Sequence, residues 1–258
     1  MEFATARCEK SDGIAYVILN RPEALNAYNI QMRDDLYEIF TIVRDDPEVQ
    51  AMIISGAGRC FCAGADLTEF GTAPSPVVAR EVRRSRDLWA VLKDMEKLTV
   101  AAMHGHVLGS GLEMALLCDL RVAAKGARFG LPETALGFIP AAGATQALPR
   151  VTRPGTALAL ILAGERIDAE EAYRIGLLHR IVSPESLLAE AENLAKRVLA
   201  AGPTITALAK EAVNKGLDMS LEEGLRLEAR LSDFAFSTED AWRRLRASGG
   251  GDEGYPLF

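Results

Sequence analysis

Apolar positions along the chain follow two patterns, short continuous runs and longer segments with a helical period. The continuous runs predict buried strands, and they lie at 14–19, 51–55, 100–103 and 120–124. Between the first two runs the apolar residues recur at helical spacing, at Ile30, Leu36, Ile39, Phe40 and Val43. Because strands alternate with helices in this order, the pattern predicts an α/β core with parallel strands.

Beyond residue 143 the pattern becomes mostly helical. We expect helices at 144–148, 153–162, 169–175, 184–201, 204–215 and 221–236. The last of these carries a broad apolar stripe, made of Leu221, Leu225, Leu231, Phe234 and Phe236. Either a helix that folds back or a neighbouring subunit would cover such a stripe. The glycine-rich segment 248–254 reads as a linker, and residues 255–258 could be free or docked.

Composition narrows the class of protein. A chain of 258 residues with 49% hydrophobic content is long enough for one large α/β domain, or for a core with a small helical appendage. The net charge of −7 opposes general binding to nucleic acid or anionic lipid, so an anionic small ligand would need a local basic patch. Apolar stretches are interrupted well before 18 residues, and Met1-Glu2-Phe3 opens no signal peptide. We therefore expect a cytoplasmic protein without a membrane partner.

The cysteines and histidines predict no metal site. Cys60 and Cys62 are the only close pair among the four cysteines, and their spacing is tighter than that of a zinc knuckle. Reduced cysteines that fill small apolar spaces are the better interpretation. His104 and His106 flank Gly105 and would point the same way on a strand, but no carboxylate or cysteine accompanies them at a ligand spacing. We expect a structural role for both, with a place for His106 on a pocket wall as the alternative.

Two glutamates stand in a glycine-rich and otherwise apolar middle of the chain, Glu113 in 108–115 and Glu133 in 129–133. Buried carboxylates are costly unless they are paired or used, so the pair indicates acid and base chemistry. Glu113 falls in the first turn of its helix, where the dipole favours the ionised form while burial opposes it. We expect Glu133 to be a loop carboxylate, because 129–139 reads as too irregular for a helix. The alternative is that Glu113 is only a favourable charge at a helix N-terminus and that Glu133 is a solvated charge on a loop.

Two glycine turns could supply an oxyanion hole. Gly109-Ser110-Gly111 precedes an apolar helix, and its main-chain N–H groups would attract developing negative charge. The turn 62–66 follows a strand and could offer the N–H of Ala65. Two such donors would stabilise an enolate, each by about 3 kcal/mol. Taken alone, neither run is specific, and an ordinary tight turn is the better interpretation, because glycine turns between strands and helices are common.

Together these segments resemble the enoyl-CoA hydratase/isomerase, or crotonase, family over nearly the whole chain. Residues 20–27 are similar to its CoA-binding turn and 61–67 to its first oxyanion loop. Residues 108–119 resemble the second oxyanion loop with its helix, and 129–140 the segment with the second acid. The resemblance implies a core of stacked ββα units at 1–195 and a C-terminal helical trimerisation region with a tail at 196–258. It also implies a homotrimer or a dimer of trimers.

The resemblance also implies a reaction. The thioester oxygen of an acyl-CoA would lie on the N–H groups of Ala65 and Ser110, with Glu113 activating water and Glu133 protonating the α-carbon. Because both glutamates are present, the resemblance favours an enoyl-CoA hydratase of fatty acid metabolism. A dienoyl-CoA hydratase and a Δ3,Δ2-enoyl-CoA isomerase are the alternatives. The N–H of Ala141 would help to hold the water. The family's substrate-binding positions fall on Arg21, Ala24, Leu25, Ala27, Ala63, Gly64, Asp66, Leu67 and Gly109.

Some positions depart from the family pattern. Ser110, Ala141 and Ala144 stand where glycine is usual, and the chain after Asp240 does not resemble the usual ending. We expect no cofactor, since coenzyme A is part of the substrate. RNA binding, known in some relatives, is disfavoured by the acidic balance and by the lack of an aromatic and basic cluster. An inactive paralogue that only builds assemblies is the remaining alternative.

Overall fold

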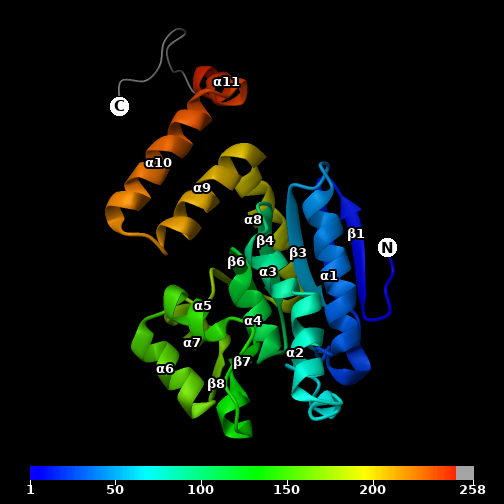
Figure 1. Ribbon diagram of the computed structural model, residues 1–258. Coiled ribbons are helices and arrows are strands. Elements are labelled where there is room, and N and C mark those ends of the chain that lie inside the picture. Colours follow the sequence, from blue (N-terminus) through cyan, green and yellow to red (C-terminus); the bar gives the residue numbers. More distant parts are fainter. Residues whose placement is uncertain (248–258) are drawn as a thin grey trace. The chain divides into compact units, whose positions relative to one another are not determined.

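The computed structural model describes residues 1–247 of the chain (Figure 1). By its internal contacts the chain forms two compact units, Met1–Ala195 and Lys196–Phe258. The predicted linker at 248–254 and the end at 255–258 lie outside the described residues. Within residues 1–247, no helix is both long and apolar enough to span a bilayer.

The first unit is built on a six-stranded sheet. Its strands run in the order β1-β2-β3-β4-β6-β9, with bounds Ala6–Ser11, Ile14–Leu19, Ala51–Gly56, Leu98–Met103, Leu120–Ala124 and Arg180–Val182. β1 pairs antiparallel with β2, and all other neighbours are parallel. The four predicted strands are confirmed as β2, β3, β4 and β6, so the α/β prediction holds.

A smaller three-stranded sheet lies next to the segments that carry Glu113 and Glu133. It has the order β5-β7-β8, with bounds His106–Leu108, Arg128–Gly130 and Arg166–Asp168. β5 and β7 run parallel, with Leu108 opposite Gly130. Since β5 leads into the helix of Glu113 and β7 leads toward Glu133, this pairing aligns the two glutamate segments.

Helices fill the connections of the first unit, and most were predicted from their period. The α-helices are α1 Ile30–Asp45, α2 Pro76–Ser85, α3 Leu88–Lys93, α4 Ser110–Leu117, α5 Ala144–Val151, α6 Pro154–Ala163, α7 Ala169–Arg174 and α8 Leu187–Leu199. Short 3₁₀ helices lie at Pro22–Ala24 (η1), Leu67–Glu69 (η2), Pro132–Leu136 (η3) and Pro184–Ser186 (η4). α1 begins where the Asn29 side chain accepts the Met32 N–H.

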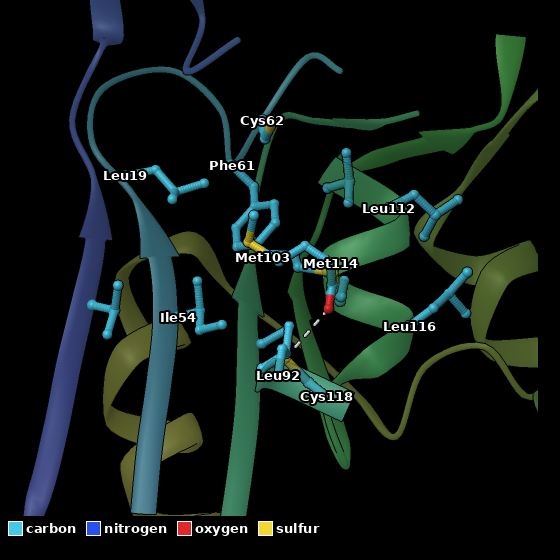
Figure 2. Packing of buried hydrophobic residues seen from close by; sticks show 14 of the residues in the cluster. Leu19, Ile54, Phe61, Cys62, Leu92, Met103, Leu112, Met114, Leu116 and Cys118 are labelled. Atoms are coloured by element: carbon cyan, nitrogen blue, oxygen red, sulfur yellow. Dashed lines mark hydrogen bonds between the residues drawn. The ribbon is translucent and has the colours of Figure 1, made fainter. Parts of the chain in front are cut away.

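The core lies between the sheet and its helices. Figure 2 shows Phe61, Met103 and Met114 packed together between β4 and α4, with Leu19 and Ile54 on the neighbouring strands. All five are essentially inaccessible to solvent. The helix that carries Glu113 is therefore anchored on apolar packing, which holds its first turn in place.

The second unit contains α9 (Pro203–Gly216), α10 (Leu221–Phe236) and α11 (Glu239–Ala247). α10 begins with a capping box between Ser220 and Glu223. It packs on α9 and α11, yet Leu221, Leu225 and Phe234 stay exposed in the single chain. Burial of this stripe against another subunit stays a prediction.

Three local features of the first unit bear on the sequence predictions. The four cysteines are buried free thiols, as expected. His104 and His106 do not share a strand, because β4 ends at Met103 and Gly105 turns the chain with a φ of 58°. The segment around Glu133 is more regular than expected, since it contains β7 and the 3₁₀ helix η3. Pro132 at the first position of η3 favours that helical turn.

Candidate active site

Glu113 lies in the first turn of α4 and is buried. The turn depends on Gly109, whose φ of 48° brings the chain sharply from β5 into the helix. The N–H of Glu113 donates to the carbonyl of Gly109 at 2.9 Å and so closes the first turn. Only 2% of Glu113 is exposed. The carboxylate therefore sits within an apolar interior, at the positive end of a helix.

Two main-chain N–H groups hold the Glu113 carboxylate from the opposite side. Ala142 and Ala144 donate to its Oε1, at 2.7 Å and 3.2 Å. Gly143 between them has a φ of 124°, which permits both N–H groups to converge. Burial raises the pKa of Glu113, while these hydrogen bonds and the charge of Arg83 oppose the rise.

Glu133 is buried without a comparable partner. It follows Pro132 in η3, and its Oε2 is enclosed and makes no hydrogen bond among the described residues. Burial, reinforced by the negative charge of Glu113, raises the pKa of Glu133 to about 7, against a lowering hydrogen bond from its own main chain. The alternative of a solvated loop charge is therefore wrong for this residue. An enclosed oxygen of this kind is suited to hold or deliver a proton.

Gly109 joins the two glutamates in space. A Cβ added to Gly109 would lie 2.6 Å from Oε1 of Glu133, and Gly109 itself caps the helix of Glu113. The electrostatic effect of Glu113 on Glu133 also requires the two carboxylates to be close. The structure thus brings the two predicted acids to one place.

The two glycine turns also lie side by side. Cys62 donates to His106 at 3.1 Å and accepts from Leu108 at 3.0 Å, so the 62–65 segment runs along β5. At the end of this pairing a Cβ on Gly109 would come within 3.5 Å of Cα of Gly64. Gly111 is equally confined, because a Cβ there would lie 2.6 Å from the Cys62 carbonyl oxygen. Only glycine permits this approach of the two turns.

The N–H groups of Ala65 and Ser110 are both unused among the described residues. Tyr28 pairs with Ala65 as an isolated bridge, in which Tyr28 donates to Gly64 and accepts from Asp66, both at 2.8 Å. Since N–H groups alternate sides along an extended segment, the Ala65 N–H points away from Tyr28. Ser110 is the first residue of α4, whose first N–H groups have no partner within the helix. Two free donors thus stand on adjacent turns.

The other predicted binding positions form a tight turn around Asn26. Arg21 pairs with Asp66 at 3.1 Å and donates to the Ala27 carbonyl at 2.6 Å, so its charge is already engaged. Ala24 closes η1, Leu25 accepts from the Ala63 N–H at 3.0 Å, and Leu67 is exposed in η2. Sequence reasoning missed Asn26, which is fully buried and donates to the carbonyls of Ala57 and Cys60.

Sequence reasoning also missed the N–H groups of Ala142 and Ala144. Ala141, the predicted water-positioning residue, is exposed, and its carbonyl accepts a hydrogen bond from Arg83. Next to it an open cavity of about 580 Å³ lies between the 141–143 loop and the helices α2 and α3. The family resemblance points to this loop through Ala141, and Gly143 marks the start of α5, but neither signal indicates the contacts of Ala142 and Ala144 with Glu113.

Comparison with known proteins gives consistent matches. A family model described as enoyl-CoA hydratase/isomerase matches residues 9–247. The crotonyl-CoA hydratase of Syntrophomonas wolfei is 38% identical, with 93% of each chain covered. The short-chain-enoyl-CoA hydratase of Clostridium acetobutylicum is 36% identical over 93% of this chain and 92% of its own. The crystal structure of enoyl-CoA hydratase from Bacillus anthracis superimposes with a TM-score of 0.89, at 33% identity over 95% and 96% of the two chains.

Proposed function

The chain belongs to the enoyl-CoA hydratase/isomerase family, and we propose that it is an enoyl-CoA hydratase which uses Glu113 and Glu133 as its acid and base. Such a hydro-lyase adds water reversibly across the α,β-double bond of an unsaturated acyl-CoA thioester. The observation that carries the mechanism is the pair of buried, mutually interacting carboxylates beside Gly109.

The thioester carbonyl oxygen accepts hydrogen bonds from the N–H groups of Ala65 and Ser110. Both donors are free of other partners among the described residues, and their turns are adjacent. As water attacks the β-carbon, the π electrons move through the α-carbon to this oxygen and form an enolate. Donors fixed in advance stabilise that charge, and each contributes about 3 kcal/mol to lowering the barrier.

The two glutamates divide the proton transfers. Glu113, whose carboxyl accepts hydrogen bonds from the N–H groups of Ala142 and Ala144, takes a proton from the attacking water as the new carbon–oxygen bond forms. Glu133, with a pKa near 7, gives its proton to the α-carbon as the enolate collapses. The product is the 3-hydroxyacyl thioester. Glu113 has then gained one proton and Glu133 has lost one, and proton exchange with solvent restores both before the next turnover. Each transfer contributes about 10²- to 10⁴-fold to the rate.

The partner of this site is the acyl-CoA itself, so no separate cofactor is needed. The turn around Asn26, with Ala24, Leu25 and Ala27, would lie along the CoA moiety beside the first oxyanion loop. The exposed apolar stripe on α10 supports assembly as a homotrimer or a dimer of trimers. A cytoplasmic location completes the proposal.

A side-by-side assay of purified protein tests this function. Crotonyl-CoA, a 3-enoyl-CoA and a cyclic dienoyl-CoA are compared by the change in absorbance of the conjugated enoyl thioester. A hydratase removes the absorbance of crotonyl-CoA in water. Turnover of the 3-enoyl thioester alone, with a gain in absorbance, would instead identify an isomerase. An absence of turnover on all three would refute the proposed function.

A further inference from the structure

The cavity of about 580 Å³ beside the 141–143 loop has a strongly basic lining. The lining contains Arg80, Arg83 and Arg84 of α2, Lys93 of α3 and a single carboxylate, that of Asp87. Lys93 also pairs with Asp94 at 2.8 Å, so the three arginines dominate the charge of the cavity. The whole chain carries a net charge of −7, so this surface is a local exception. Its volume lies within the usual range of small-molecule sites.

The walls of this cavity connect directly to the reacting centre. Ala142 and Gly143 line one wall, and the N–H of Ala142 holds the carboxylate of Glu113. Trp89 lines another wall, and its ring packs against Tyr28 with 5.2 Å between the centroids. Tyr28 in turn holds the strand segment of Ala65. The cavity therefore adjoins both the Glu113 side and the oxyanion side of the site.

The positive charges on α2 are not explained by internal pairing. Arg80 and Arg84 make no ion pair with any described residue in 1–247. Arg86, directly after the end of α2, pairs with Glu38 at 3.0 Å. Arg80 and Arg84 are four residues apart on one helix, and like charges at this spacing destabilise a helix. A negative ligand in the cavity would offset that repulsion. Arg83 also donates to the Ala141 carbonyl, so the cluster is tied to the 141–143 loop.

We propose that this cavity binds a carboxylate at the far end of the acyl chain, so that the preferred substrate is an unsaturated acyl-CoA with a second acid group. The inference rests on the proposed function and names its substrate class. The thioester end is fixed at Ala65 and Ser110, which leaves the cavity beyond Glu113 to the distal end of the acyl group. Arginine recognises carboxylates through parallel hydrogen bonds in a planar geometry.

A matched pair of substrates tests this inference. 2-Hexenoyl-CoA and 2-hexenedioyl-CoA have the same chain length and differ in one terminal carboxylate. We expect the wild-type protein to favour the diacid at least tenfold in kcat/KM. The preference should shrink as KCl rises from 20 to 300 mM, because salt screens exposed charges. Equal kcat/KM for the two thioesters, or a preference that salt does not change, would overturn the inference.

The double variant R80Q/R84Q assigns the effect to the cavity. We expect kcat/KM for the diacid to fall 10- to 100-fold, and that for the monoacid to change less than threefold. The control R44Q/R153Q removes the same charge from exposed arginines outside the cavity and should leave the preference intact. An equal loss on both thioesters, together with weaker inhibition by free CoA, would show that the arginines bind CoA phosphates and would refute the inference.

The two proposals fail in different ways. If wild-type protein hydrates neither thioester, the proposed function itself is refuted and the inference falls with it. If it hydrates 2-hexenoyl-CoA without favouring the diacid, the function stands and only the inference is refuted. The salt and substrate arms use the wild-type protein, so they decide the matter even if R80Q/R84Q does not fold.

Discussion

The surroundings of Glu113 and of Glu133 differ although the two residues share one site. Glu113 stands at a helix start, with two main-chain N–H groups on one oxygen. Glu133 stands on a single 3₁₀ turn, with an enclosed oxygen that lacks a hydrogen bond among the described residues. Burial raises the pKa of both, but only at Glu113 do donated hydrogen bonds from other residues oppose it.

Because of these surroundings, two identical side chains can take opposite roles. Hydrogen bonds to a carboxylate favour its charged form, so Glu113 is prepared to act as a base. Enclosure next to another negative charge favours the protonated form, so Glu133 is prepared to act as an acid near neutral pH. The two glutamates differ in their main-chain hydrogen bonds and in their enclosure. Substitutions that alter one glutamate or its surroundings at a time test this difference.

Replacing either glutamate should have the largest effect. Glu113→Gln and Glu133→Gln keep shape but remove proton transfer, so each should lower kcat for crotonyl-CoA hydration by about 10²- to 10⁴-fold. Initial rates with saturating substrate measure this. The double variant should be little worse than either single one, because the groups act as a unit. Full activity in either single variant would contradict the division of roles.

Filling the space at Gly109 should have the next largest effect. Gly109→Ala adds a Cβ 2.6 Å from Oε1 of Glu133, at a φ of 48° that favours glycine. Displacing that carboxylate should lower kcat/KM by about 10- to 100-fold. Gly155→Ala, in α6 with no atom within 4 Å of the new Cβ, is the matched control and should retain activity. Equal activity of the two variants would argue against the close approach.

The buried acid should also leave a signature in stability. The carboxyl of Glu133 has a pKa of about 7 in the folded chain against an ordinary 4.5, so the folded state binds the extra proton between these values. Stability therefore falls as pH rises from about 4.5 to 7, by up to about 3 kcal/mol.

Glu133→Gln removes this penalty. The Tm of Glu133→Gln minus that of the wild type should therefore be larger at pH 8.5 than at pH 5. The exposed substitution Glu96→Gln serves as control and should show no such trend. Melting curves at the two pH values measure the effect, and a difference that is constant with pH would refute the raised pKa.

The smallest effect should come from the Ser110 side chain. Ser110→Ala removes the hydroxyl but keeps the main-chain N–H that would meet the thioester oxygen. We expect kcat/KM to change less than about threefold, since the donor survives. A loss beyond tenfold would show that the hydroxyl itself contacts the substrate or the water.

The sequence predicts the central fold well because burial of parallel strands leaves continuous apolar runs. It misses β1, whose exposed half carries Glu9 and Lys10, and it misses β5, β7, β8 and β9, which are too short to show a period. In the site, the two glutamates and the glycine turns carry recognisable side-chain patterns. The N–H groups of Ala142 and Ala144 carry none, because any residue has a main-chain donor.

The basic cavity also could not be predicted from the sequence. The charges of 77–95 are visible in the sequence as an amphipathic segment, but their convergence on the 141–143 loop depends on tertiary contacts such as that of Arg83 with Ala141. Sequence periodicity assigns the face of a helix, and only the fold assigns what that face meets.

The contact between Trp89 and Tyr28 gives this protein a built-in optical reporter. The chain has two tryptophans, and Trp242 belongs to α11 in the other unit, so Trp89 is the one whose indole borders the cavity. Any molecule that enters there changes the polarity around that ring. Intrinsic fluorescence, with Trp242→Phe to remove the background, therefore follows occupancy of the cavity directly and independently of turnover.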